Sequence, residues 1–154
     1  MHSDLWSFSL DLYARLGIEQ ACLELQADGA NVCLMLGAAW LGHLGVACTP
    51  ERLAQLRTLA WPWHDEVIRP LRKLRQDWTN AAKLDRELEV MREQIKTLEL
   101  EAERQLLTRI ENLAQEWAAV GADDMTLWLE GVVPSSAREN RGALQRLHAA
   151  STSA

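Results

Sequence analysis

Hydrophobic and polar positions alternate with a helical period over residues 81–120, a stretch that contains neither glycine nor proline. Its apolar residues recur every three or four positions and are Leu84, Leu88, Met91, Ile95, Leu98, Ala102, Leu106, Ile110, Leu113 and Trp117. This spacing predicts one amphipathic helix of roughly 60 Å. Such a helix is about twice as long as a small domain is wide, so we expect part of its apolar stripe to need a partner.

The apolar stripe follows a heptad pattern in its first half. From Leu84 to Ala102 the steps alternate between four and three residues, as in a coiled-coil seam, and two successive steps of four then interrupt the pattern. Packing within the chain and pairing between chains both remain open, because bundle helices and coiled-coil seams share such a stripe. The partner is then a second copy, another protein or the C-terminal tail. The residues predicted to make the interaction are Leu84, Leu88, Met91, Ile95, Leu98, Leu106 and Trp117.

The first part of the chain, residues 1–79, predicts a compact module of five helices. The first helix is capped by Ser3 and buries apolar residues as far as Leu16, and the others begin at Ile18, after Asn31, at Pro50 and after Trp63. The third helix, residues 32–44, is apolar nearly all round. We therefore expect it at the centre of the module, with neighbours on every side.

Two prolines interrupt the end of this module. Trp61-Pro62-Trp63 predicts a bend of the chain, and Pro70 predicts a kink in the fifth helix, because proline lacks the backbone N–H and clashes with the preceding turn. The outer face of this helix carries Arg69, Arg72 and Lys73, which an anion or nucleic-acid site would use. Because acidic residues lie beside them, we interpret this face as solvated instead.

The last part of the chain, residues 121–154, predicts a short helical tail. A first helix runs from Met125 to Glu130, with Leu127 and Trp128 as its docking residues. Ser136-Ala137-Arg138-Glu139 matches a capping box and predicts a last helix from Ala137 to about Ala149. We expect residues 151–154 to be frayed.

Charge and composition exclude several classes of partner. The chain has a formal net charge of −6 and no strongly basic half, so we expect no nucleic-acid partner. The apolar run from Val32 to Ala47 is shorter than the ~20 residues that a membrane span needs, so we expect no membrane partner. Cys22, Cys33 and Cys48 lack paired spacing and are interpreted as reduced, and no secretory signal precedes them; both observations favour the cytoplasm.

Two motifs in the first helices carry a resemblance. Leu5-Trp6-Ser7-Phe8-Ser9, followed by Ala21-Cys22-Leu23-Glu24-Leu25-Gln26, resembles a proteobacterial family of conserved domains of unknown function over roughly residues 4–80. The resemblance implies a cytoplasmic bacterial protein whose N-terminal half is the family module, and it supplies no activity or ligand. Glu24 and Gln26 are the polar residues of interest in the second motif. A cap or an interhelix hydrogen bond is their ordinary role.

Few residues suggest chemistry. Cys33, His43 and Cys48 lack the spacing of a metal site, so we interpret them as core residues. His64-Asp65-Glu66 places an imidazole beside two carboxylates, but no nucleophile or phosphate-binding loop accompanies them. We therefore predict no catalytic residue, no metal and no cofactor.

These observations predict an all-α protein in three segments, 1–79, 80–120 and 121–154. We expect a non-enzymatic cytoplasmic adaptor or regulatory protein that acts through protein contact by its long helix, with a protein partner or as a homodimer. The alternative is a helical domain that binds a small molecule or a metal, possibly an enzyme, with a pocket around Val32–Leu44. Binding of a specific protein supports the first hypothesis, and binding of a ligand or metal by the purified chain supports the second.

Overall fold

The computed structural model describes residues 4–154. In this part of the chain every named element of secondary structure is a helix or a helical turn. The predicted all-α fold is confirmed. Ser3, the predicted first cap, lies outside the described residues, and α1 is capped by Asp4. The helices are α1 (Leu5–Tyr13), α2 (Ile18–Ala27), α3 (Val32–Leu44), α4 (Pro50–Trp63), α5 (Arg69–Asp77), α6 (Arg86–Leu113), α7 (Met125–Val132), α8 (Ser135–Arg138) and α9 (Arg141–Thr152), with a π-helical turn η1 (His64–Ile68) and 3-10 turns η2 (Ala81–Lys83) and η3 (Ala114–Glu116).

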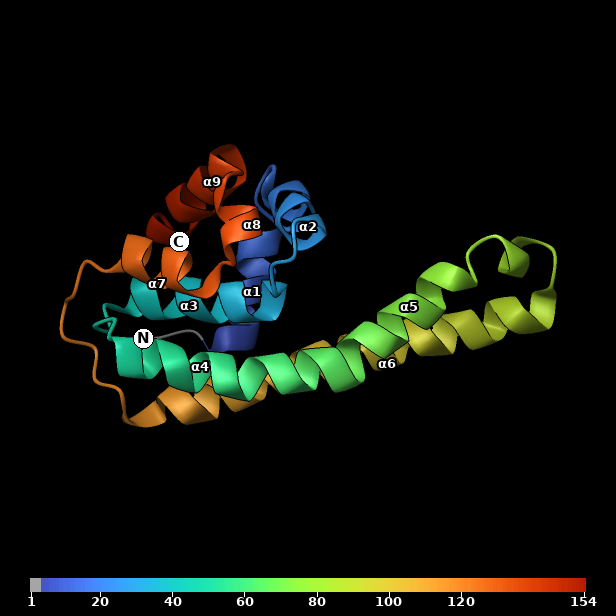
Figure 1. Cartoon of the computed structure of the whole chain (residues 1–154), viewed down its shortest axis with the longest axis horizontal. Coiled ribbons are helices and arrows are strands. Elements are labelled where there is room, and N and C mark those ends of the chain that lie inside the picture. The colour runs from blue at the N-terminus through green and yellow to red at the C-terminus, as the bar shows by residue number, and fades with distance from the viewer. Residues whose placement is uncertain (1–3) are drawn as a thin grey trace.

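The helices form a rounded body and a long hairpin that projects from it (Figure 1). One arm of the hairpin is the continuous succession of α4, η1 and α5, and the other arm is α6, whose 28 residues span about 42 Å. Near the body, α6 packs against α1 and α3. Farther out, α5 packs against α6, and no residue of α5 is buried. The outer half of the hairpin is therefore held by the contact between its own two arms.

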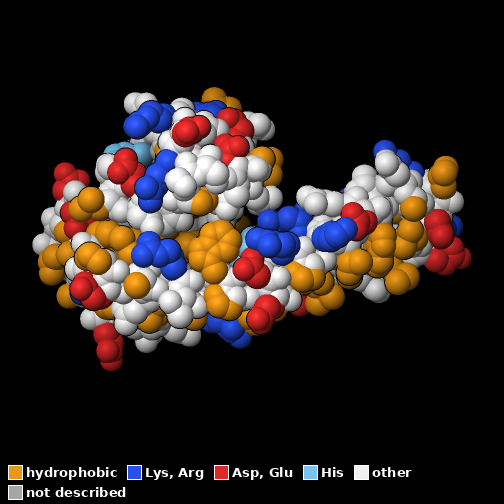
Figure 2. All heavy atoms as spheres, viewed as in Figure 1, with side chains coloured by type: hydrophobic (Ala, Val, Ile, Leu, Met, Phe, Trp, Pro, Cys, Tyr) orange, Lys and Arg blue, Asp and Glu red, His pale blue; other side chains and the backbone are white. Residues whose placement is uncertain are grey.

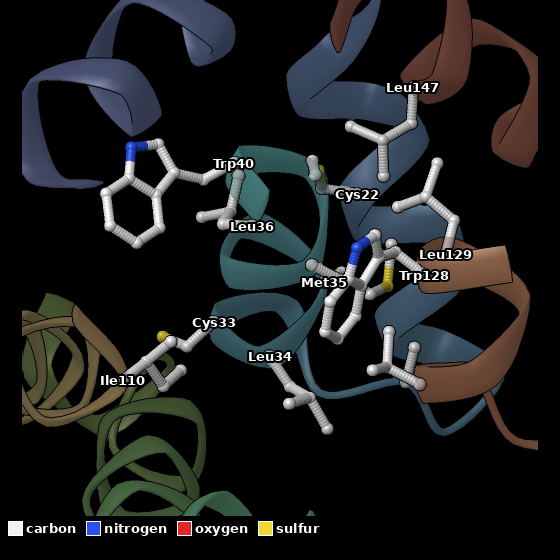
Figure 3. Packing of buried hydrophobic residues seen from close by; sticks show 14 of the residues in the cluster. Cys22, Cys33, Leu34, Met35, Leu36, Trp40, Ile110, Trp128, Leu129 and Leu147 are labelled. Carbon is white, nitrogen blue, oxygen red and sulfur yellow. The ribbon is translucent and has the colours of Figure 1, made fainter. Parts of the chain in front are cut away.

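Helix α3 lies at the centre of the body, as its apolar character predicts. Nine of its residues are buried, and it contacts α1, α4, α6, α7 and α9. Leu34, Met35 and Leu36 point to different sides of the helix, each towards a different group of neighbours (Figure 3). Gly37 lets α6 approach closely, since a Cβ there would lie 2.8 Å from a methyl carbon of Ile110. A helix with buried residues on every side has no free face for an external partner.

The C-terminal tail completes the core of the body. α7 packs against α3 and α9 packs against α2 and α3, so residues from all three sequence segments share one hydrophobic cluster. Trp128 is fully buried, and its indole N–H donates a hydrogen bond of 2.8 Å to the Val46 carbonyl. α9 extends to Thr152, three residues beyond the predicted end, and Ser151 is buried within it. The tail is therefore occupied with contacts to the body.

The first arm of the hairpin differs from the prediction at both prolines. The helix continues through Trp61-Pro62-Trp63 and through Pro70, and the arm changes direction where α4 passes into α5 (Figure 1). Between them lies the π-helical turn η1, in which the Arg69 amide reaches back five residues to the His64 carbonyl. This wider turn lies between the two prolines, directly before the helical turn that contains Pro70.

The second arm is shorter than the helix predicted for residues 81–120. α6 begins after Asp85, whose side chain accepts a hydrogen bond from the Leu88 amide and so caps the helix. It ends at Leu113, and Ala119 then forms an isolated antiparallel bridge with Val46. Another predicted helical residue, Leu16, follows the end of α1 and is fully exposed. Among residues 4–154, none of the helices combines the length and apolar character needed to cross a membrane.

Candidate interaction surface on the helical hairpin

The structure divides the seven predicted interaction residues between the interior and the surface. Leu106 is buried in the core of the body. Trp117 is half-buried and stacks on Trp128, with ring centroids 6.2 Å apart. Both side chains are therefore used within the chain. The other five residues lie along the outer part of the hairpin: Leu84, Leu88, Met91, Ile95 and Leu98.

These five residues form two rows on the second arm. Leu88 and Ile95 are half-buried, and with the buried Ala102 they repeat every seven positions on the side of α6 that meets the first arm. Leu84 and Met91, with Leu98, also repeat every seven positions, but their exposed fractions are 94%, 50% and 47%. The hairpin thus covers one row of the heptad stripe and leaves the other open.

We call the open row, together with the exposed Leu74 of α5 on the other arm, the outer apolar face; its residues are Leu74, Leu84, Met91 and Leu98. Figure 2 shows hydrophobic side chains gathered over the outer part of the hairpin. Scattered single hydrophobic residues are ordinary on a protein surface, whereas hydrophobic residues that gather in a row are a candidate contact site. The outer apolar face is therefore the candidate interaction surface.

A cluster of charged side chains fixes the two arms against each other. Glu99 of α6 is 6% exposed and accepts hydrogen bonds from Arg75 Nε at 2.5 Å and Arg72 Nε at 3.0 Å. Arg72 also reaches Glu103 at 3.4 Å. Arg92 of α6 donates to the Arg75 carbonyl at 2.9 Å. These bonds cross from one arm to the other. They hold the two arms together in the part of the hairpin where no residue of α5 is buried.

Ion pairs engage the three basic residues that were considered for an anion site on the fifth helix. Arg72 is paired with Glu99, Arg69 with Asp65 at 2.9 Å, and Lys73 with Asp77 at 2.6 Å. Each of the three bases therefore faces a carboxylate of the same chain. This arrangement offers no concentration of unpaired positive charge for a polyanion.

His64 lies at the base of the hairpin in the π-helical turn and is buried against Trp61. Burial lowers the pKa of His64 below its ordinary 6.5, and the positive charges of Arg72 and Arg69 lower it further. The unfolded chain therefore binds a proton near pH 6.5 that the folded chain takes up only at lower pH. Below that pH, protonation favours the unfolded state.

We expect the free energy of unfolding to decrease as the pH falls below about 6.5, until the pKa of folded His64 is reached. Urea denaturation between about pH 7.5 and pH 5 measures this dependence. His64→Gln should flatten the slope in this range. An equal slope in the wild type and the variant would contradict the assignment to His64.

The other polar candidates have structural partners. Glu24 of α2 accepts hydrogen bonds from Asn140 at 3.2 Å and Arg146 at 3.1 Å, which join α2 to the tail, and these bonds lower the pKa of Glu24. Burial raises the pKa of Cys33, which is not paired in a disulfide. Among residues 4–154, no group of three or more His, Cys, Asp or Glu side chains is placed to hold a metal ion.

Fold and surface together define an all-α protein with a projecting helical hairpin and an uncovered apolar row near its end. The family described as "Protein of unknown function (DUF2390)" matches residues 4–110, and the chain belongs to this family. The match covers more than the 4–80 inferred from the two motifs, since it includes both arms of the hairpin to Ile110. No curated protein and no solved structure matches the chain.

Proposed function

We propose that this protein is a non-enzymatic cytoplasmic adaptor or regulatory protein that assembles through the outer apolar face of its hairpin, and that the occupant of this face is a second copy of the chain. The observation that carries the proposal is the exposed seven-residue repeat of Leu84, Met91 and Leu98. The three unpaired cysteines, Cys22, Cys33 and Cys48, support a reducing compartment.

The repeat has the symmetry that a pair of identical copies requires. A twofold interface brings the same patch of both copies together, so the patch must complement itself. In an antiparallel pair centred on Met91, Leu84 of each copy lies opposite Leu98 of the other. Alternate apolar contacts of this kind convert two hairpins into a four-helix bundle.

The C-terminal tail, which is the possible partner within the same chain, already packs against the body. The C-terminal tail was one of the three occupants that the sequence allowed for the stripe. In the structure α7 packs on α3 and α9 packs on α2 and α3, so the tail lies within the body and away from the hairpin tip (Figure 1). The tail is therefore not available to the outer apolar face, which supports a second molecule as its occupant.

The expected affinity is low. Covering the eight exposed side chains of two copies gains roughly 8–10 kcal/mol, at about 1 kcal/mol for each half-exposed residue. Association costs at least about 4 kcal/mol, and the low end applies because the hairpin is already rigid. The difference corresponds to a dissociation constant on the order of 0.1 mM. Such an affinity suits reversible assembly by a regulatory protein.

Sedimentation equilibrium of the whole protein between about 0.01 and 1 mM tests the proposal. We expect a monomer–dimer equilibrium for the wild type and a monomer for Met91→Glu combined with Leu98→Glu. The matched control is Val90→Glu, because Val90 is exposed on α6 outside the repeat. This variant should dimerise as the wild type does.

Two results would contradict the proposal. A wild type that stays monomeric throughout would show that a different protein covers the face, or none. Equal dimerisation of the double variant and the wild type would place the contact elsewhere. Circular dichroism of each variant establishes that the helices are retained, since these positions are exposed and tolerate polar residues.

A further inference from the structure

An open cleft of about 520 Å³ lies between the last three helices of the chain. α7 forms one side of it, and α8 and α9 form the other. Figure 1 shows these helices in the rounded body, away from the hairpin tip. The volume is within the range of roughly 300–1,000 Å³ that small-molecule sites occupy. No residue of α3 lines the cleft, so it is separate from the pocket predicted around Val32–Leu44.

Two exposed arginines line the cleft without an ion pair. Within residues 4–154, the side chain of Arg141 makes no hydrogen bond and no ion pair. Arg138 uses Nε alone, which donates a hydrogen bond of 3.1 Å to the Val133 carbonyl. By contrast Arg146, on the same helix as Arg141, is paired with Glu24. Arg141 and the two terminal nitrogens of Arg138 are therefore available to an oxyanion in the cleft.

The balance of charge along the cleft favours an anion with one negative charge. Glu130 is the carboxylate that lines the cleft, and it forms no ion pair with Arg138 or Arg141. Two positive charges and one negative charge leave the cleft with a net charge of +1 when His148 is neutral. A carboxylate matches this charge, and a guanidinium group can bind it through two parallel N–H donors.

The remaining lining residues give the cleft an apolar part and join its two sides. Leu129 of α7, which is 2% exposed, and the half-buried Leu144 of α9 both line it. Thr126 Oγ1 of α7 lies 3.1 Å from His148 Nε2 of α9, and this hydrogen bond links the two sides. Apolar surface beside a few convergent polar groups is the usual composition of a small-molecule site.

We infer that this cleft binds a small organic carboxylate, whose charged group pairs with Arg141 and the terminal nitrogens of Arg138 and whose apolar part packs against Leu144. The inference is independent of the assembly proposed above, because the outer apolar face lies on the hairpin and the cleft lies on the tail.

The probe for the test is phenylacetate, which joins a phenyl ring to one carboxylate. The neutral comparator is 2-phenylacetamide, which has the same shape without the charge, and the comparator with a second negative charge is phenyl phosphate. Two-dimensional ¹H–¹⁵N NMR of the whole protein follows the backbone amides and the Gln145 side-chain amide during each titration. We expect phenylacetate to shift the resonances of the cleft residues with a dissociation constant on the order of 1 mM. The amide should bind at least about fivefold more weakly.

Arg141→Glu is the sharpest variant, because it reverses the charge that the carboxylate meets. Arg141 is exposed and is the first residue of α9, a position at which an acidic residue favours a helix, so the variant should fold. It should abolish the binding of phenylacetate. The matched control is Arg86→Glu, since Arg86 is exposed, is the first residue of α6 and does not line the cleft. This control changes the net charge of the protein equally and should leave the dissociation constant unchanged.

Binding that is localised to the cleft, weaker for the amide, lost in Arg141→Glu and retained in Arg86→Glu supports the inference. Four results overturn it. The first two are the absence of shifts up to about 10 mM phenylacetate and equal binding of 2-phenylacetamide. The third is equal loss of binding in both charge-reversal variants, which would indicate only the net charge of the protein. The fourth is tighter binding of phenyl phosphate than of phenylacetate, which would assign the cleft to phosphate instead.

Discussion

Replacing Trp128 by alanine is expected to lower the free energy of unfolding by about 4 kcal/mol. The indole is fully buried between α3 and the tail, stacks on Trp117 and donates its N–H to the Val46 carbonyl. The substitution creates a large cavity and also leaves a buried acceptor without its donor. Ordinary domains have a total stability of about 5–15 kcal/mol, so the substitution should remove between about a quarter and four-fifths of it. Urea denaturation followed by circular dichroism measures the change.

Leu127→Ala is the matched control for this prediction. Leu127 is the preceding residue of α7 and is 56% exposed, so its loss should change the free energy of unfolding by less than about 0.5 kcal/mol. Similar stabilities of the two variants would mean that the tail docks loosely on α3. In that case the shared core of body and tail described above would not be a single cooperative unit.

The centre of the body could be predicted from the sequence because its signals are local. The run from Val32 to Leu44 is apolar on all sides, Asn31 caps it and Gly45 ends it in the left-handed conformation. Each of these signals acts within a few residues, and the structure has the helix at the predicted bounds. Its central position follows directly, since only a surrounded helix can bury residues on every face.

The continuity of the first hairpin arm could not be predicted in the same way. Pro62 and Pro70 favour an interruption by every local rule. The helix is nevertheless continuous, and α4 and η1 pack along α6, which lies far along the chain. A local pattern does not contain the distant residues that pack against this arm, so the interruption of the helix predicted at the two prolines was wrong.

The residues of the candidate surface could be predicted as a group from the sequence. Which of them are covered by the first arm and which are exposed could not. The heptad pattern identified Leu88 and Ile95 on the same terms as Met91 and Leu98, because all four lie on one stripe. Which row is covered depends on the side from which α5 approaches α6. The buried pairing of Arg72 and Arg75 with Glu99 fixes that approach, and the charges taken separately resemble a solvated face.

Replacing Glu99 by leucine is expected to lower the free energy of unfolding by about 3 kcal/mol at pH 7. The carboxylate is buried between Arg72 and Arg75, and its removal leaves Arg75 without its ion pair and Arg72 with Glu103 alone. The loss of an enclosed partner is costly because the remaining charge stays desolvated. The matched control is Glu93→Leu, since the Glu93–Lys96 pair is exposed and contributes less than about 1 kcal/mol.

The pH dependence distinguishes the lost ion pair from a simple packing defect. Burial alone would raise the pKa of Glu99, but hydrogen bonds from Arg75 and Arg72 outweigh it and hold the pKa below 4.5. The stabilisation is therefore complete above about pH 4.5 and is lost as the pH falls through the pKa of the folded state. Denaturation curves of the wild type and Glu99→Leu should converge in that range. A difference in stability that stays constant down to about pH 3 would assign the effect to packing, and the charged cluster would then not be what fixes the two arms of the hairpin.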